Sequence, residues 1–231
     1  MKKLLALAMA ALLALAAAGC GGSSEPSSSP AASGGESSSA ASQAETEPTV
    51  LKVAASPAPH AEILNSVKEA LAAGGIDLQV VEYTDYIMPN TAVDAGEMDA
   101  NYFQHQPYLT NFNAENGTDL VSVVSVHFEP LGIYPGKTAT LEELADGATI
   151  VVPNDPTNEG RALNLLAANG IITLSEDAGL EATINDIVEN PRNVQITEVE
   201  AAQVPMALPD YDFGVINGNY AVAAGLSDTI L

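Results

Sequence analysis

The 231-residue sequence carries 30 acidic and 7 basic residues, a formal net charge of −23 at pH 7. A surface this acidic repels phosphate backbones, which argues against nucleic-acid binding and against a bound organic polyanion. A zwitterionic ligand is compatible with this acidic surface, because it carries no net charge. Cys20 is the only cysteine, so no internal disulfide can stabilise the fold.

The first twenty residues have the pattern of an export signal. Met1–Lys3 is basic, and Leu4–Ala18 is an almost unbroken apolar run. The run is shorter than the roughly 20 residues that a transmembrane helix needs. It ends at Ala17-Ala18-Gly19-Cys20, which resembles a bacterial lipobox, in which the cysteine is lipidated. We therefore expect residues 1–20 to be a signal peptide and Cys20 to carry lipid; the alternative is an ordinary signal with an incidental cysteine.

Residues 21–48 are rich in Ser, Ala, Gly, Pro and Glu and contain no aromatic or basic residue. Such a segment cannot bury enough apolar surface to offset the entropy of ordering. We predict a disordered, acidic tether over 21–48.

The remaining sequence alternates between strand-like and helix-like segments, which predicts an α/β fold. The first group is expected to contain strands at 51–55, 77–83, 98–103 and 120–126, helices at 61–73, 89–95 and 107–113, and a crossing segment at 128–136. The second group is expected to contain strands at 149–152, 194–199 and 212–216, a helix at 158–168 and an amphipathic stretch at 182–188. Two groups separated by a crossover suggest two lobes with a ligand cleft between them.

The turn from Val152 to Arg161 is the most informative of the strand-to-helix turns, where α/β proteins bind ligands. Thr157 or Asn158 is expected to cap the following helix, and the free backbone N–H groups there favour an anion. Arg161 could add a forked bond to a carboxylate. A surface arginine is the ordinary alternative.

Two further clusters could contribute to a site. Tyr102-Phe103-Gln104-His105-Gln106-Pro107-Tyr108 could enclose a thioether sulfur, which contacts aromatic rings favourably, although core packing explains such rings equally well. Tyr86 would be a further wall. Asn217, at the end of a late strand, offers both a carbonyl and an amide, although Asn-Gly is also a common turn.

Taken together, these motifs resemble one family. Pro59–Leu64, Thr84–Tyr86 with Pro89-Asn90, Asp99–His105 with Pro107–Leu109, Pro153–Arg161, Val188–Pro191 and Val215–Asn217 occur in order. In that order they resemble the NlpA-type methionine-binding lipoproteins, the substrate receptors of methionine ABC importers, over residues 51–226.

The resemblance implies a two-lobed, type II-like periplasmic-binding-protein fold that closes on methionine. Lobe I would span 49–133, with 218–231 returning to it, and lobe II would span 134–217. Arg161 would bind the ligand carboxylate, Asn217 and Asn154 its polar end, and Tyr86, Phe103 and His105 its side chain, with Tyr108 nearby.

The resemblance also implies the setting in which the protein works. We expect a monomer anchored by lipid on the extracytoplasmic face of the cell membrane, which delivers methionine to an importer of permease and ATPase subunits. No cofactor and no catalysis are expected. The family continues with a strand and a helix that return to the first lobe, whereas this sequence ends at Leu231, so the expected first lobe is incomplete or the sequence is a piece. The expected tether is also longer than is usual in the family.

Other functions fit the sequence less well. A receptor for a methionine-containing dipeptide would use the same carboxylate contact. A zinc receptor could use His60, His105 and His127, but none of them is paired at helical spacing. An enzyme is disfavoured because the sequence contains no Gly-x-Ser-x-Gly elbow and no His-Glu-x-x-His motif. A structural lipoprotein would need no cleft.

Overall fold

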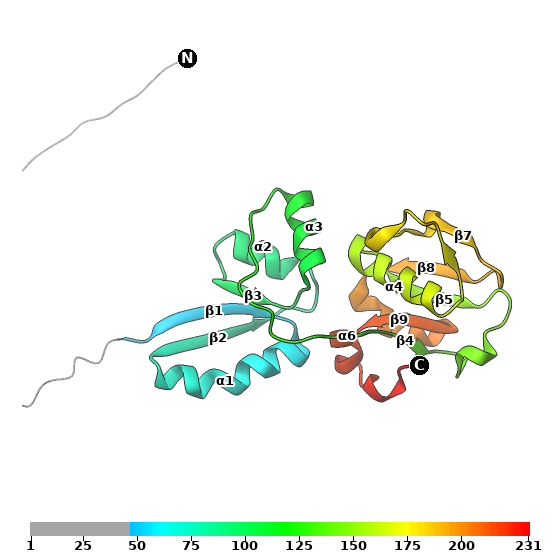
Figure 1. The fold of residues 1–231 in the computed structure, drawn as a ribbon. Coiled ribbons are helices and arrows are strands. Elements are labelled where there is room, and N and C mark those ends of the chain that lie inside the picture. The colour runs from blue at the N-terminus through cyan, green and yellow to red at the C-terminus, as the bar shows by residue number, and fades with distance from the viewer. Residues whose placement is uncertain (1–46) are drawn as a thin grey trace, which may run out of the picture. The chain divides into compact units, whose positions relative to one another are not determined.

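The computed structural model describes residues 47–231, which form an α/β structure (Figure 1). The prediction of an α/β fold is therefore confirmed. The expected signal peptide with Cys20 lies outside the described residues, as does the expected tether apart from its last two residues. Within residues 47–231, no helix is both long and apolar enough to cross a membrane.

The first sheet is parallel and has the strand order β2–β1–β3. Its strands are β1 (Thr49–Ala55), β2 (Ile76–Glu82) and β3 (Ala100–Tyr102). Its helices are α1 (Glu62–Ala73), α2 (Met88–Asp94) and α3 (Gln106–Asn116). All six were predicted, with ends shifted by up to three residues, because turn residues such as Gly74 and Gly75 mark their boundaries clearly.

The predicted strand at 120–126 is wrong. Residues 119–130 form no helix or strand, and Val121, Val123, Val124 and Phe128 are each at least 71% exposed. β-Branched residues favour a strand only when a neighbouring strand completes the ladder. None of the described residues pairs with this segment.

The second sheet has the strand order β4–β9–β5–β8. Its strands are β4 (Leu131–Pro135), β5 (Thr149–Pro153), β8 (Gln195–Val199) and β9 (Phe213–Asn217). β4 runs antiparallel to β9, and the other pairs are parallel. The expected crossing segment at 128–136 therefore ends in a strand. The expected lobe boundary at residue 133 falls inside β4, all of which pairs with β9.

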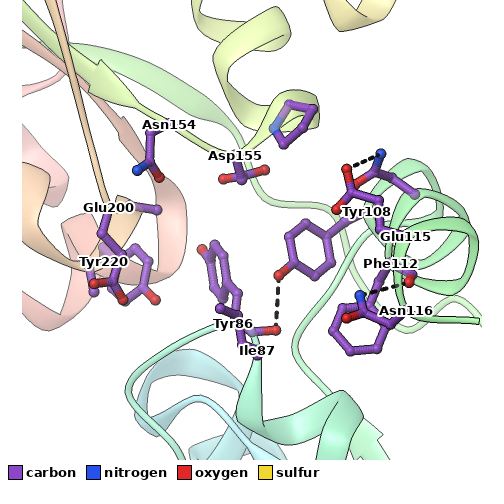
Figure 2. Close-up of a pocket in the computed structure, with 14 residues that line it drawn as sticks. Tyr86, Ile87, Tyr108, Phe112, Glu115, Asn116, Asn154, Asp155, Glu200 and Tyr220 are labelled. Carbon is purple, nitrogen blue, oxygen red and sulfur yellow. Dashed lines mark hydrogen bonds between the residues drawn. The ribbon is translucent and has the colours of Figure 1, made fainter. Parts of the chain in front are cut away.

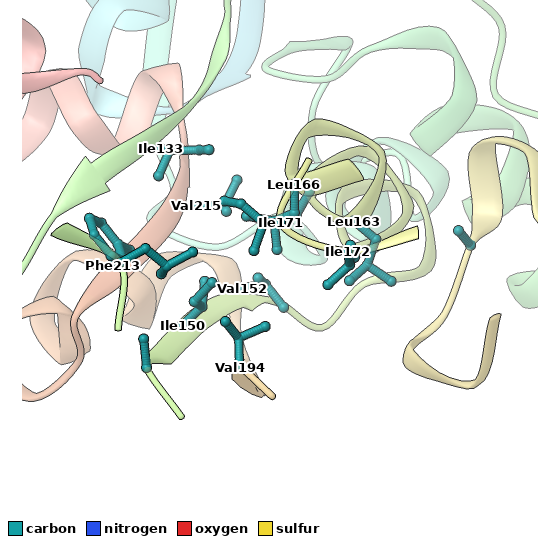
Figure 3. Close-up of a cluster of buried hydrophobic side chains, with 14 residues drawn as sticks. Ile133, Ile150, Val152, Leu163, Leu166, Ile171, Ile172, Val194, Phe213 and Val215 are labelled. Atoms are coloured by element: carbon teal, nitrogen blue, oxygen red, sulfur yellow. The ribbon is translucent and has the colours of Figure 1, made fainter. Parts of the chain in front are cut away.

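The helix α4 (Pro156–Ala168) covers the second sheet and forms its main core (Figure 3). Ile150 and Val152 from β5 meet Leu163 and Leu166 from α4, and Phe213 from β9 completes the layer; all five are fully buried. Burying each such side chain contributes about 1.5–3 kcal/mol. This core fixes the helix relative to the turn that precedes it.

Smaller elements surround the second sheet. β6 (Thr173–Leu174) pairs with β7 (Ile187–Glu189), and the two short helices are α5 (Val204–Ala207) and α6 (Gly218–Ala223). The expected amphipathic stretch at 182–188 is a single helical turn, Ile184–Asp186, that leads into β7. Gly160 of α4 is required by close packing, because a Cβ there would lie 2.1 Å from the backbone oxygen of Leu180.

The last residues contact both parts of the structure. α6 packs against the turn Pro57–Ala61 that follows β1. At the end of the chain, the backbone N–H of Leu231 donates to the oxygen of Ile133 in β4 at 2.9 Å. Residues 218–231 therefore touch the first sheet's loops through α6 and the second sheet through Leu231.

Candidate functional site

A cavity of about 250 Å³ opens where the loops of both sheets meet (Figure 2). Side chains from the loop before α2, from α3, from the β5–α4 turn, from the residues after β8 and from α6 line it. Three of the predicted site residues, Tyr86, Tyr108 and Asn154, are among them. Its position at the carboxyl ends of β5, β8 and β9 is where α/β proteins bind small ligands.

Aromatic rings form one wall of this cavity. The ring centroid of Tyr86 lies 5.7 Å from those of Phe103 and Tyr108 and 5.0 Å from that of Tyr220. The hydroxyl of Tyr108 donates to the backbone oxygen of Tyr86 at 3.0 Å, which holds the Tyr108 ring against the Tyr86 backbone (Figure 2). Offset and tilted rings at these separations pack favourably with one another. The wall therefore offers apolar ring surface to the cavity.

Two tyrosine hydroxyls join the first group of elements to α6. Tyr86 donates to Oδ1 of Asn219 at 2.5 Å, and Tyr220 donates to the backbone oxygen of Thr84 at 3.0 Å. Asn219 is almost fully buried. These two bonds start from rings that line the cavity and run in opposite directions between the first group of elements and α6, so they hold those rings in place.

The start of α4 forms the polar side of the site. Asp155, with extended backbone, caps the helix by accepting from the backbone N–H of Asn158 at 3.0 Å, and Pro156 follows as the first helical residue. The prediction that Thr157 or Asn158 is the cap is therefore wrong. Proline is favoured at the first helical position, and this places the cap one residue before it.

Asn158 holds together two of the predicted residues. Its Oδ1 accepts from Nη1 of Arg161 at 2.9 Å and from Nδ2 of Asn217 at 2.9 Å. Asn158 is 1% exposed, and Oδ1 of Asn217 is buried without a partner in residues 47–231. The structure thus brings Arg161 and Asn217 to one buried amide.

Arg161 has unused capacity for an anion. Its guanidinium is half-buried, and no carboxylate in the described part of the chain forms an ion pair with it. Burial lowers the pKa of Arg161, an effect opposed by the nearby groups of Tyr86, Asp155 and Glu129. A guanidinium has five N–H donors and does not deprotonate in proteins, so most of its donors are free for a carboxylate.

His105 lies in the same environment. Its ring centroid is 6.4 Å from that of Tyr108, and its Nε2 is buried without a hydrogen-bond partner among residues 47–231. Burial and, secondly, the charge of Arg161 lower the pKa of His105 to about 4. The ring is therefore neutral at pH 7 and presents an uncharged edge.

Ring contacts group Tyr86, Phe103, His105 and Tyr108, and Asn158 groups Arg161 with Asn217. Of the predicted residues, Phe103, His105, Arg161 and Asn217 do not line the open cavity. The sequence analysis missed the structural roles of Asn158, Asn219 and Tyr220. Asn158 precedes Arg161 by three residues, so the two share a helix face, and that spacing could have revealed it.

Comparison with known proteins gives consistent matches. The model of the family described as NlpA lipoprotein matches residues 51–230. The membrane lipoprotein TpN32 of Treponema pallidum is 46% identical over 169 residues, which cover 73% of this chain and 63% of that protein. The D-methionine-binding lipoprotein MetQ of Escherichia coli K12 is 44% identical over 155 residues, which cover 66% and 57%. The chain thus spans less than two thirds of the length of these relatives.

Solved structures of similar proteins also match this chain. A nutrient binding protein from Burkholderia cenocepacia bound to methionine superposes with a TM-score of 0.74 at 44% identity, covering 76% of this chain and 75% of that chain. Lipoprotein Tp32 from Treponema pallidum gives a TM-score of 0.74 at 43% identity, covering 77% and 74%.

Proposed function

This chain belongs to the NlpA lipoprotein family, and from that premise we propose that it captures methionine outside the cytoplasm and delivers it to an ABC importer. Its fold is the two-lobed periplasmic-binding-protein fold of its structural neighbours. Relatives are named D-methionine-binding lipoproteins, and one neighbour was solved with methionine, which supports methionine as the ligand.

The observation that carries the proposal is the half-buried Arg161, whose charge acts on His105, a ring 6.4 Å from that of Tyr108 in the aromatic wall. An amino acid needs a cation for its carboxylate and, in the case of methionine, an apolar surface for its thioether. Arg161, held in place by Asn158, supplies the cation. The rings of Tyr86, Phe103 and Tyr108 supply the apolar surface.

We assign the other roles in the same way. Asn217 and Asn154 would bind the polar end of the ligand, because Asn217 has a buried carbonyl without a partner in the described chain and Asn154 lines the cavity. His105 would close the side-chain pocket with its neutral ring. In the proposed arrangement, the lobes are residues 49–130 and 131–217, with α6 packed against the first.

The cellular setting is part of the same proposal. Cys20 would carry the lipid that anchors the protein to the extracytoplasmic face of the membrane, and residues 21–48 would give it reach. Its partners would be the permease and ATPase of a methionine importer. A similar solved structure, from Streptococcus pneumoniae, is described as the substrate binding protein of a methionine transporter. We propose that the protein acts as a monomer and performs no catalysis, as its relatives are named for binding.

Native mass spectrometry of the purified protein tests the ligand directly. We expect a bound mass equal to methionine, which Arg161→Ala loses. Loss of a charged hydrogen-bond pair costs about 1.5–3 kcal/mol, so methionine titration should show at least about tenfold weaker binding. Arg192→Lys is the matched control, because Arg192 bonds the backbone of Leu144 away from the cavity and should leave affinity unchanged.

Parallel titrations separate the closest alternatives. L-methionine, D-methionine and a methionine-containing dipeptide share the carboxylate, so their relative affinities identify the preferred ligand. If ligand-free protein bound none of these, the proposal would be wrong. If Arg192→Lys weakened binding as much as Arg161→Ala, the assignment of the carboxylate site would be wrong.

A further inference from the structure

A second cluster of chemically active side chains lies outside the cavity. His60 ends the turn after β1, and His127 and Glu129 lie on the connection that leads into β4. One ligand atom from each of the three lies within 4.8 Å of the other two. His105, the remaining histidine, is not in this group. None of the three lines the cavity beside Tyr86.

The contacts within the cluster converge on one carboxylate oxygen. Oε1 of Glu129 lies 2.8 Å from Nε2 of His127 and 3.6 Å from Nε2 of His60. The first is a hydrogen bond, whereas the second is too long for one. A hydrogen bond therefore joins His127 to Glu129, whereas His60 joins them through edge-on ring packing against His127 and the 3.6 Å approach to Glu129.

His60 is buried, and one of its ring nitrogens has no hydrogen-bond partner in the described chain. It is 3% exposed, and its Nδ1 has no hydrogen-bond partner within residues 47–231. Nε2 of His60 is the ring nitrogen that faces Oε1 of Glu129, so it is the atom that would ligate an ion held between these side chains.

From this arrangement we propose that His60, His127 and Glu129 bind a divalent transition-metal ion of the zinc class, with a fourth position open to water. Zinc takes histidine nitrogen at about 2.0–2.1 Å and carboxylate oxygen at about 2.0–2.2 Å, so ligand atoms around one tetrahedral ion lie roughly 3.3–3.5 Å apart. The observed separations, from 2.8 Å to within 4.8 Å, bracket that value. Side-chain movements of about 1 Å would complete the site.

A neighbouring residue is placed to orient one ligand. The hydroxyl of Tyr102 contacts Nδ1 of His127, and Nε2 of the same ring faces Glu129. Without metal, Nε2 carries the proton and donates to Glu129. With metal, the neutral ring carries its proton on Nδ1 and donates to the phenol oxygen, as metal-ligating histidines usually do toward an outer partner.

The placement of the three ligands suggests what the ion does. His60 belongs to the loops of the first sheet, whereas His127 and Glu129 belong to the exposed connection that becomes β4. A bound ion would fasten this connection to the turn after β1. It would be a fixed structural ion rather than transported cargo.

Zinc titration of the full chain, first treated with chelator, tests the proposal. We expect one Zn²⁺ per chain with micromolar or tighter affinity, at least tenfold weaker in His127→Ala. His127 is partly exposed, so this variant should fold. His105→Gln removes a different imidazole and is the matched control that should keep zinc binding. Co²⁺ should give the visible absorption of a tetrahedral site in the parent chain and not in His127→Ala.

Three outcomes would overturn the site. The first is no zinc binding at tens of micromolar zinc, and the second is an equal loss of zinc affinity in His127→Ala and His105→Gln. The third is weak binding of several zinc ions that salt displaces, which would indicate adsorption to the acidic surface. A Cys20→Ser chain excludes binding by the thiol. Methionine affinity should stay within about threefold in His127→Ala, so failure of the metal site and failure of the proposed function are distinguishable.

Discussion

Nδ2 of Asn217 donates to Oδ1 of Asn158 at 2.9 Å, although the two residues are 59 positions apart. The bond connects the end of β9 to the first turn of α4. Because Arg161 donates to the same oxygen, one side-chain carbonyl sets the positions of Arg161, which we assign to the ligand's carboxylate, and of Asn217, which we assign to its polar end.

Replacing Asn158 with alanine should weaken methionine binding and destabilise the protein. The change removes the shared acceptor and leaves the Asn217 amide buried without its partner, which costs about 1–3 kcal/mol. We expect a lower free energy of unfolding in denaturant and at least about fivefold weaker methionine binding by calorimetry. Asn164→Ala, an exposed change on the same helix, should leave affinity unchanged. Wild-type affinity in Asn158→Ala would show that Arg161 does not need this support.

Replacing Tyr86 with phenylalanine tests the bond between the Tyr86 hydroxyl and Asn219. The ring contacts are kept, but the buried carbonyl of Asn219 loses its donor. We expect a loss of about 1–3 kcal/mol in unfolding free energy, measured by denaturant titration. Tyr83→Phe is the control, because no hydrogen bond of the Tyr83 hydroxyl is found among the described residues. Equal stability of both variants would mean that the Tyr86 bond contributes nothing to folding.

A buried carboxyl on α4 predicts a specific pH dependence of stability. Glu159 is 5% exposed and accepts from the backbone N–H of Ile184 at 3.2 Å. Burial, together with the charge and hydrogen bonding of Glu198, raises the pKa of Glu159 from 4.5 to about 7. The folded state then binds the proton more tightly than the unfolded state, so its contribution to stability is greatest below pH 4.5 and is lost as pH rises to about 7.

The variant Glu159→Gln should remove this contribution to the pH dependence. Glutamine resembles the protonated acid and keeps an oxygen for Ile184. Denaturant titrations at several pH values should show the variant gaining stability over the parent as pH rises from 4.5 to 7. Glu142→Gln removes the same charge from an exposed turn and should not reproduce this gain. If the difference between Glu159→Gln and the parent were constant with pH, the raised pKa would be refuted.

Most helices and strands could be predicted because their signals are local. Gly74 and Gly75 end α1 where the sequence predicts, whereas α4 begins at Pro156, two residues before its predicted start. The error at 120–126 arose because a strand also needs a partner, and the sequence of Val121 to Val126 carries no information about whether one is adjacent. The local sequence sets the secondary structure that a segment favours, but a strand forms only where another strand pairs with it.

The candidate site shows the same division. Arg161 and the aromatic residues could be proposed from residue type and position after a strand. The role of Asn158 depends on the position of Asn217 at the end of β9. The role of Asn219 depends on the position of Tyr86 in a loop of the first sheet. Such pairings across more than fifty residues follow from the packing of the core and not from any motif.

The exposed valines of 119–130 affect how unfolding of this protein can be followed. Dyes such as ANS report loosened cores by binding apolar surface, and Val121, Val123, Val124 and Phe128 offer such surface in the folded chain. A dye signal would then be present before any denaturation. The sequence has no tryptophan, so the seven tyrosines, several of them clustered at the cavity, are the better intrinsic probes.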